Sequence, residues 1–380
     1  MRSAPRRLIA LALALVLVIG VVVAVGSQVL GRLAPAATPV KGLIGSEKLP
    51  FFQDQRVIDA FRKAGFDVTV ATAGSRQIAS SNLTGQDFAF PAGVPAAQKV
   101  RTDHPGSTSY VPFYTPMAIA TWKPIVDLLT QAGVIRQRNG YLALDVAAYM
   151  DLVNKDTRWS DLPNNTAYSV NKSILVTTTD VRTSNSAAMY LSIVSYVANG
   201  NNIVELGPTT TTLAQQLAPL FLKQGFSETS TEGPFDDYLV QGIGKAPMVM
   251  VYESQFIARA AANDGSITPD MELVYPEPTI FSKHTLVSLT PTGQRLGDFL
   301  TTDPGIRALA TDYGFRTSDT EGFKNFVTSH NLSVPDTLID VIDPPTYESL
   351  EAMITTLEQI YAGAGAPPPA TDAPASPSGS

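Results

Sequence analysis

Cysteine is absent from this chain of 380 residues. A chain without cysteine has no disulfide framework, no thiol nucleophile, no zinc finger and no lipid-modified N-terminal cysteine. This absence is compatible with an extracytoplasmic location. Hydrophobic residues make up 44% of the chain and charged residues 16%, a composition typical of a globular protein with a large core.

Patterns that carry catalysis are also scarce. The three histidines, His104, His284 and His330, show no metal-binding spacing, and neither Gly-x-Ser-x-Gly nor Gly-x-Gly-x-x-Gly occurs. The segment 242–245 has the glycines and lysine of a P-loop but lacks its length and its Ser/Thr. We interpret Asp236-Asp237 as a solvated pair on an exposed loop. The sequence therefore predicts a protein without catalytic residues, metal ligands or cofactors, and thus not an enzyme.

Acidic residues are missing from the first 46 positions. From Glu47 onward the chain has 22 basic and 34 acidic residues, a net charge of −12. Because nucleic acids are polyanions, this balance argues against a nucleic-acid partner. It favours the approach of cations, or of a ligand held by local dipoles.

One long apolar run lies near the N-terminus. Three arginines, at positions 2, 6 and 7, precede Leu8 to Gly26, which is long enough to span a bilayer as a helix. Positive charge before such a run keeps the N-terminus in the cytoplasm and sends the remainder outward. We predict an uncleaved membrane anchor with an extracytoplasmic chain. The alternative is cleavage near Ala34–Ala37, which would give a secreted protein.

Strand and helix patterns alternate between residues 41 and 362. The Ala/Pro-rich segment 27–41 is interpreted as a stalk, and 363–380 as a disordered Pro/Ala-rich tail. A β-branched strand is expected at Ile174–Thr178, followed by a helix that ends at Asn199-Gly200. Strands alternating with helices predict an α/β fold with mostly parallel sheets.

Four unusual polar turns follow predicted strands. In open α/β sheets, ligands bind beyond the carboxyl ends of strands, where the free N–H groups of the next helix are available. The turns are Gly45-Ser46-Glu47-Lys48, Gly74-Ser75-Arg76, Thr183-Ser184-Asn185-Ser186 and Tyr252-Glu253-Ser254-Gln255.

Taken in this order, the four turns resemble those of type 2 periplasmic solute-binding proteins, most closely the molybdate-binding type. The resemblance covers residues 41–316 and continues through Tyr275-Pro276 and Gly314-Phe315-Arg316. It implies two lobes joined by crossover strands near 116–121 and 273–278, closing on a ligand like a hinge. Lobe I would comprise 41–118 and 275–362, lobe II 119–274, and residues 1–40 the anchor and stalk.

The resemblance implies that the turn residues contact the ligand. The predicted contacts are Ser46, Glu47, Ser75, Arg76, Thr183, Ser184, Asn185, Tyr252 and Glu253. Several have alternative roles: Ser184 as a helix N-cap, Arg76 in a salt bridge to Glu47 or Asp180, and Glu253 as a solvated carboxylate at a helix start. The tryptophans at 122 and 159 are expected to pack in the core, and His284 to donate a structural hydrogen bond.

The charged turns separate this chain from oxyanion binders. Glu253 beside a ligand would repel an oxyanion unless Arg76 or Arg182 offset its charge. The ligand is therefore expected to be small and polar or charged, and its identity stays open. The resemblance implies a membrane-anchored receptor that delivers this ligand to an ABC permease or reports to another envelope protein. The alternative hypotheses are an envelope interaction module with a degenerate cleft, and, third, an enzyme on the same fold.

Overall fold

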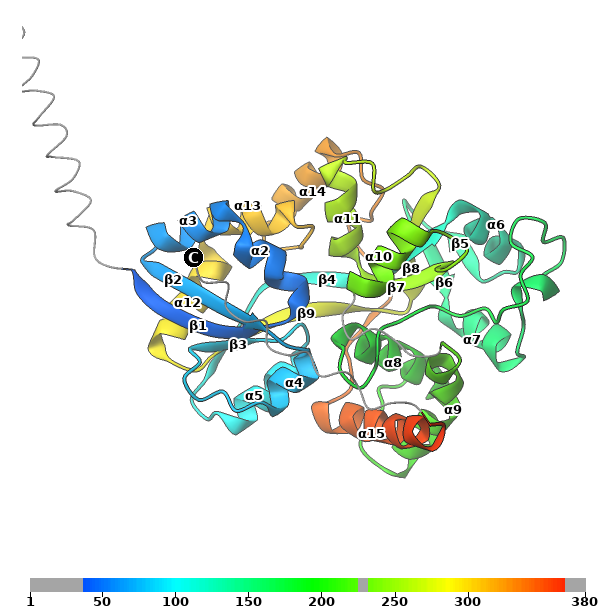
Figure 1. Cartoon of the computed structure of the whole chain (residues 1–380), viewed down its shortest axis with the longest axis horizontal. Helices are drawn as coiled ribbons and strands as arrows, with labels where there is room; N and C mark the ends of the chain where they lie inside the picture. Colours follow the sequence, from blue (N-terminus) through cyan, green and yellow to red (C-terminus); the bar gives the residue numbers. More distant parts are fainter. Residues whose placement is uncertain (1–36, 225–231, 366–380) are drawn as a thin grey trace, which may run out of the picture.

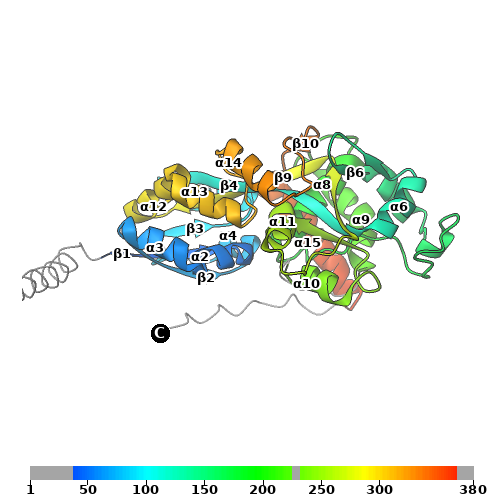
Figure 2. The same ribbon diagram turned by 90° about the horizontal axis from the view of Figure 1, so that it is seen from above.

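The computed structural model describes residues 37–224 and 232–365, which form two α/β halves joined by long strands (Figures 1 and 2). We call the half that contains β1 the first lobe and the half that contains α8 the second lobe. The first lobe contains β1 (Thr38–Ile44), α2 (Leu49–Gln53), α3 (Gln55–Lys63), β2 (Phe66–Thr72), α4 (Ser75–Ser80), β3 (Phe88–Phe90), α5 (Val94–Asp103), α12 (Pro291–Thr302) and α13 (Pro304–Asp312).

The second lobe follows in one continuous stretch of chain. It contains α6 (Lys123–Gln131), β5 (Ile135–Gln137), β6 (Leu142–Asp145), α7 (Val146–Asn154), α8 (Asn185–Ala198), α9 (Pro208–Leu222), α10 (Glu232–Gln241), β7 (Met248–Tyr252), α11 (Glu253–Ala262) and β8 (Met271–Glu277). The remaining elements run between or across the lobes: β4 (Thr108–Trp122), β9 (Thr279–Ser288), α14 (Thr320–Ser329), β10 (Val341–Ile342) and α15 (Tyr347–Gly363).

The strands form one path in the order β2-β1-β3-β9-β4-β8-β6-β5, with β7 also on β4 and β10 on β9. The fold is α/β as predicted, but the sheet is mixed rather than mostly parallel. Parallel pairs join β1 to β2 and β3, and β6 to β8. The centre is antiparallel, because β4 leaves the first lobe and β9 returns to it in the opposite direction.

The change of lobe is visible in the pairing of β4. As far as Pro116, this strand pairs with β9; from Met117 onward it pairs with β7 and β8. This change of partner lies at the crossover expected near 116–121. The passage from β8 to β9 lies at the crossover expected near 273–278. The proposed lobe boundaries themselves stay a prediction. Helix α15, which the prediction assigns to lobe I, packs along α9 of the second lobe and also contacts α5.

Aromatic rings fill the core of the first lobe, where Phe113 stacks on Phe315 with ring centroids 4.3 Å apart. The core of the second lobe surrounds the apolar helix α8. Both tryptophans are buried there, as predicted. Burial of such large side chains supplies most of the favourable free energy of folding.

Helices α2 and α3 are separated at Asp54, whose extended backbone ends α2 and whose carboxylate accepts a hydrogen bond from the Arg56 N–H to cap α3. One local expectation was wrong. The expected strand Ile174–Thr178 is reduced to a parallel bridge between Thr177 and Val249. The N–H of the following residue, Thr178, donates to the Gln224 side chain instead of to a neighbouring strand.

The predicted anchor Leu8 to Gly26 lies outside the described residues, as does the tail from residue 366. Within 37–224 and 232–365, no helix has the length and apolar character needed to cross a membrane.

Candidate functional site

A buried cluster of charged and polar side chains lies where the lobes meet. Glu47 and Lys48 follow β1, and His284 belongs to β9. The Lys48 ammonium forms a salt bridge with Glu47 Oε1 and lies 3.2 Å from His284 Nδ1, which is itself 3.3 Å from Glu47 Oε1. The Lys48 ammonium also lies 4.8 Å from the centre of the Phe90 ring.

These contacts fix the charge states of the cluster. Burial acts to raise the pKa of Glu47, but Lys48 and His284 outweigh it and hold the pKa of this carboxyl well below its usual range. Burial, reinforced by the Lys48 charge, lowers the pKa of His284 to about 4. Near neutral pH Glu47 is therefore a carboxylate and His284 a neutral imidazole, while burial lowers the pKa of Lys48 against the opposing charge of Glu47.

Two atoms of this cluster have no partner among the described residues. Both contacts of Glu47 use Oε1, so Oε2 is unpaired, although the Glu47 side chain is only 9% exposed. His284 is fully buried, and its Nε2 atom has no hydrogen-bond partner. Leaving a buried polar atom such as His284 Nε2 without a partner costs about 1–3 kcal/mol.

The second lobe contributes Asn185 and Tyr252. The Asn185 amide donates to the Tyr252 hydroxyl at 3.1 Å and to the Ser282 hydroxyl at 3.3 Å. Burial, followed by the negative charge of Glu47, raises the pKa of Tyr252 far above its usual value, so this hydroxyl stays neutral. The structure thus brings Glu47, Asn185 and Tyr252 to one interlobe region, with the half-buried Ser46 beside Glu47.

The other predicted hydroxyls lie on a different side of this region. Ser75 accepts a hydrogen bond from the Ala92 N–H at 2.9 Å. Ser184 precedes α8 but its side chain does not cap the helix; its hydroxyl lies 3.1 Å from that of Ser186. Ser184 is thus the N-cap residue of α8, as the alternative role expected, but without the side-chain hydrogen bond that would stabilise the helix.

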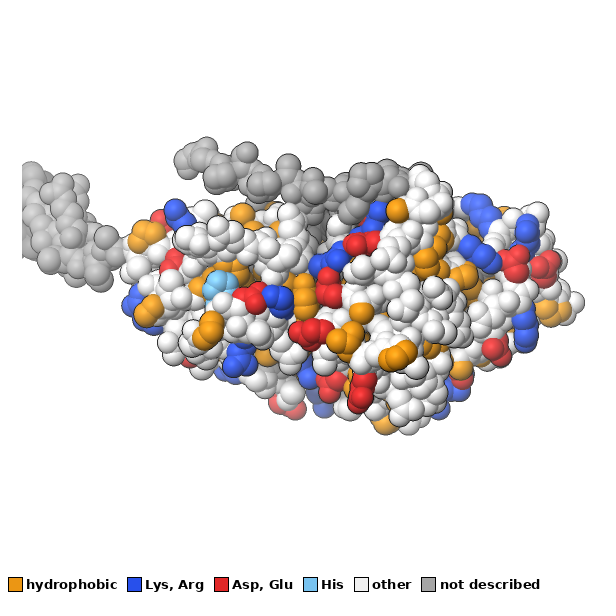
Figure 3. All heavy atoms as spheres, turned by 90° about the horizontal axis from the view of Figure 1, so that it is seen from below, with side chains coloured by type: hydrophobic (Ala, Val, Ile, Leu, Met, Phe, Trp, Pro, Cys, Tyr) orange, Lys and Arg blue, Asp and Glu red, His pale blue; other side chains and the backbone are white. Residues whose placement is uncertain are grey.

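Helix α15 closes this side of the interlobe region. The Arg76 guanidinium of α4 donates to both carboxylate oxygens of Glu351, to Glu358, and to the Arg182 carbonyl across the lobe boundary. Neither alternative partner, Glu47 or Asp180, is used. Burial opposes the charged form of Arg76, but Glu358 and Glu351 prevail and raise its pKa. Figure 3 shows this face, where acidic and basic side chains lie together near the middle.

Little space is left for a ligand here. The cavity lined by Ser75, Arg76, Ser184 and Asn185 together with α15 has a volume of only about 20 Å³. The lobes also touch directly, since a Cβ added to Gly74 would lie 2.5 Å from the Thr183 carbonyl oxygen. Thr183 itself lies in a turn closed by hydrogen bonds to the Asp180 carbonyl.

The charges of Asp180 and Glu253 are both neutralised within the chain. Asp180 accepts from the Arg182 guanidinium through both oxygens, at 2.9 Å and 2.6 Å. Glu253 is fully buried and is bound by Arg316 at 2.7 Å and 2.9 Å and by the Tyr275 hydroxyl at 2.5 Å. The description of Glu253 as a solvated carboxylate was wrong, and both of its oxygens are occupied by protein.

The opposite side of the interlobe region is open. A cavity of about 530 Å³ lies between Glu47 and Pro50 of the first lobe and helices α10 and α11 of the second. Its walls include the rings of Phe235, Tyr313 and Phe315, and its charged lining consists of Glu47, Asp236 and Arg259. This volume falls in the range of small-molecule sites. Asp236 belongs to α10, not to the loop that the sequence suggested.

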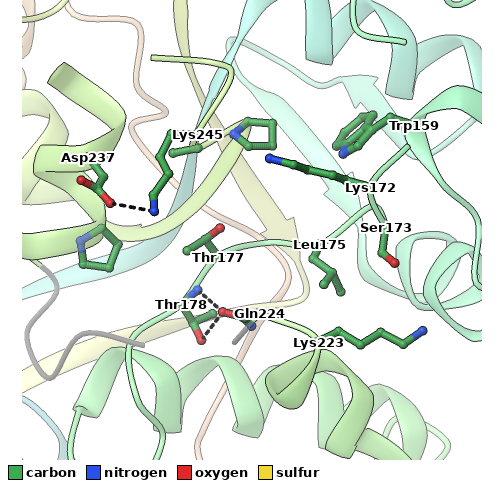
Figure 4. Close-up of a pocket in the computed structure, with 13 residues that line it drawn as sticks. Trp159, Lys172, Ser173, Leu175, Thr177, Thr178, Lys223, Gln224, Asp237 and Lys245 are labelled. Atoms are coloured by element: carbon green, nitrogen blue, oxygen red, sulfur yellow. Dashed lines mark hydrogen bonds and ion pairs between the residues drawn. The ribbon is translucent and has the colours of Figure 1, made fainter. Parts of the chain in front are cut away.

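Another cavity, of about 460 Å³, lies within the second lobe (Figure 4). Two of its three lysines already face carboxylates: Lys245 lies 3.7 Å from Asp237, and Lys223 lies 2.6 Å from Asp156. In Figure 4 the Lys223 side chain extends away from Lys172 and Lys245. This cavity has no contribution from the first lobe, so closure of the lobes would not enclose it.

Three residues of this region carry no sequence signal for a site. Lys48 lies in one of the polar turns and Phe315 in the Gly314-Phe315-Arg316 motif, but neither position predicts a ligand contact. His284 was interpreted as structural because a single histidine in a strand carries no spacing signal. The alternation of β9 places this side chain on the interlobe face.

Comparison with solved structures supports the fold. No protein-family model matches the chain, and no curated protein matches it. An ABC-transporter solute-binding protein from Thermotoga lettingae, bound to α-D-tagatose, superposes with a TM-score of 0.54 at 13% identity, covering 86% of this chain and 95% of that one. A protein from Bordetella parapertussis assigned as an extracellular solute-binding protein gives 0.50 at 12% identity, covering 86% and 98%. The chain therefore has the type 2 solute-binding fold that its turns implied.

Proposed function

We propose that this chain is an extracytoplasmic solute-binding receptor that captures a small ligand between its lobes. The observation that carries the proposal is the open interlobe cavity of about 530 Å³ over the partly paired carboxylate of Glu47. The cavity is bounded by both lobes, so movement of one lobe toward the other would change its volume. A ligand that contacts both lobes binds the closed form better and shifts the equilibrium toward it.

Among the predicted contacts, Glu47 is the one that lines this cavity. Ser46, Asn185 and Tyr252 belong to the adjoining polar region and would be reached by a ligand that penetrates deeper. Ser75, Arg76, Thr183 and Ser184 would be reached only after separation from α15 or from the opposite lobe. Glu253 would act by holding Arg316 rather than by touching the ligand.

The receptor would be attached to the membrane by Leu8 to Gly26 and would deliver its ligand to an ABC permease. The likeness in fold to an ABC-transporter solute-binding protein supports this partner. Cleavage near Ala34–Ala37 would instead release the receptor. Binding without catalysis and without a cofactor remains part of the proposal.

A second candidate function is an envelope interaction module whose cleft no longer admits a ligand. One observation favours it: α15 fills the side of the interlobe region that carries Ser75, Arg76 and Ser184. Under this hypothesis the two lobes would be held together permanently, and the chain would act through its outer surface.

The two functions are separated by ligand-induced thermal stabilisation of the full-length chain. We expect at least one compound from a panel of amines, amino acids, sugars, oxyanions and divalent metal ions to raise the unfolding midpoint. Ala258→Trp, which places an indole in the cavity, should abolish that shift, whereas Ala262→Trp at the exposed end of α11 should preserve it. Absence of any shift, or a shift unaffected by Ala258→Trp, contradicts the interlobe receptor.

A further inference from the structure

The lining of the open interlobe cavity combines a carboxylate with aromatic rings. Glu47 lies at the first-lobe side, and its side chain is nine-tenths buried. Because Lys48 and His284 both contact Oε1, the second oxygen is available toward the cavity. The buried Lys48 is itself bound to Glu47, to His284 and to the face of Phe90, so its ammonium is not directed to the ligand.

Three rings line the same cavity as this carboxylate. Phe315 packs against Phe113 and His284 and so is fixed in place. Tyr313 is fixed by a hydrogen bond from its hydroxyl to Asp54 at 2.9 Å, and Phe235 by stacking on Tyr238. Aromatic faces carry negative partial charge, and together with a carboxylate they are the groups that bind organic ammonium ions.

Charge at the mouth of the cavity comes from the second lobe. Asp236 of α10 and Arg259 of α11 are exposed, and within the described residues neither forms an ion pair within 4.0 Å. The lining thus has two carboxylates and one guanidinium, in a chain segment whose net charge from Glu47 onward is −12. The long-range field and the lining therefore both attract positive charge.

We propose that the ligand of this cavity is an organic ammonium ion, with its charged nitrogen on Glu47 and its apolar body against Phe315 and Tyr313. This inference rests on the proposed function, since it names the ligand class of the same interlobe site. A simple amine and a zwitterionic amino acid share the required nitrogen. Arg259 distinguishes them, because it would bind a carboxylate on the ligand and repel a second positive charge.

Three probes with the same apolar body test the class: phenethylamine, phenylalanine and 3-phenylpropionate. Isothermal titration of the full-length chain should detect binding of phenethylamine or phenylalanine but not of the anion 3-phenylpropionate. Glu47→Gln should weaken binding about tenfold or more. Arg259→Glu, at an exposed position, should strengthen binding of phenethylamine and weaken that of phenylalanine. Arg101→Glu, on the exposed face of α5, is the matched control and should change neither.

Tighter binding of 3-phenylpropionate than of phenethylamine would overturn the inference. If Glu47→Gln disturbs folding, Arg259→Glu still decides, because unchanged phenethylamine affinity in that variant also contradicts the inference. Failure of the ligand class is distinguishable from failure of the receptor. A sugar or oxyanion whose binding is lost in Ala258→Trp would refute the class and keep the receptor, whereas no binding by the three probes or by any compound of the thermal-shift panel would refute both.

Discussion

At the scale of single residues, the interlobe cluster shows how neighbouring charges set protonation. His284 is buried beside Lys48, and both facts favour the neutral ring. Its pKa of about 4 in the folded chain lies below the 6.5 expected for the unfolded chain. Between these values the unfolded chain binds the proton more tightly, so acidification favours unfolding.

We therefore predict that the free energy of unfolding falls as the pH drops from about 6.5 to about 4, by an amount on the order of 3 kcal/mol from His284. Glu47 adds a further loss only at lower pH, because its folded-state pKa is depressed below the usual carboxyl value. Urea unfolding at several pH values measures this dependence. His284→Phe should flatten the slope, while His104→Phe should not. Identical slopes in both variants and the parent chain would refute this assignment.

The ion pair between Glu253 and Arg316 gives a second residue-scale prediction. Glu253→Gln would leave the buried Arg316 guanidinium without its counter-charge, at a cost of about 3–5 kcal/mol. Chemical denaturation measures the loss, with the exposed Glu321→Gln as control. A variant of normal stability that binds ligand more weakly would instead identify Glu253 as a ligand contact.

At the scale of elements, the close contact between the turn before α4 and the turn before α8 holds the lobes together. Gly74 abuts the Thr183 carbonyl, and no side chain fits between them. Gly74→Ala should push the lobes apart here and speed amide hydrogen exchange in α4 and the first turns of α15. Gly244→Ala, where a Cβ meets open space, is the matched control. Unchanged exchange in Gly74→Ala would show that the contact does not restrain the lobes.

Arg76 gives a related prediction for α15. Partly exposed ion pairs stabilise by about 1 kcal/mol or less, so Arg76→Gln should change global stability little. It should nevertheless accelerate hydrogen exchange in α15 around Glu351 and Glu358. Arg101→Gln serves as control. A large loss of ligand affinity without faster exchange in α15 would mean that Arg76 contacts the ligand, as the sequence suggested.

The elements also show what sequence patterns can and cannot predict. The turns that carry Ser46, Ser75 and Tyr252 lie at strand ends as predicted, because strand ends and helix starts are local properties. The partners of Arg76 could not be found in this way. Glu351 and Glu358 lie some 275 positions further on, and only the path of α15 beneath both lobes brings them together. The burial of Glu253 likewise depends on the distant Arg316.

At the scale of the whole molecule, the interlobe region has one closed and one open side. Helix α15 and the Gly74 contact close the side that carries Ser75 and Ser184, and the cavity beside Glu47 leaves the α10–α11 side open. Closure around β4 and β9 would then narrow the α10–α11 side. The resemblance of the turns implied the two lobes, whereas the packing of α15 against α9 and α5, which would decide the side open to a ligand, depends on contacts between distant segments.

The distance across the open cavity tests this account most directly. The chain has no native cysteine, so Gln53→Cys on α2 and Ala262→Cys on α11 can carry spin labels at exposed positions on opposite lobes. We predict that a compound which raises the unfolding midpoint also shortens the label-to-label distance measured by pulsed electron paramagnetic resonance, and that Ala258→Trp abolishes the shortening. A stabilising compound that leaves this distance unchanged would contradict ligand capture between the lobes.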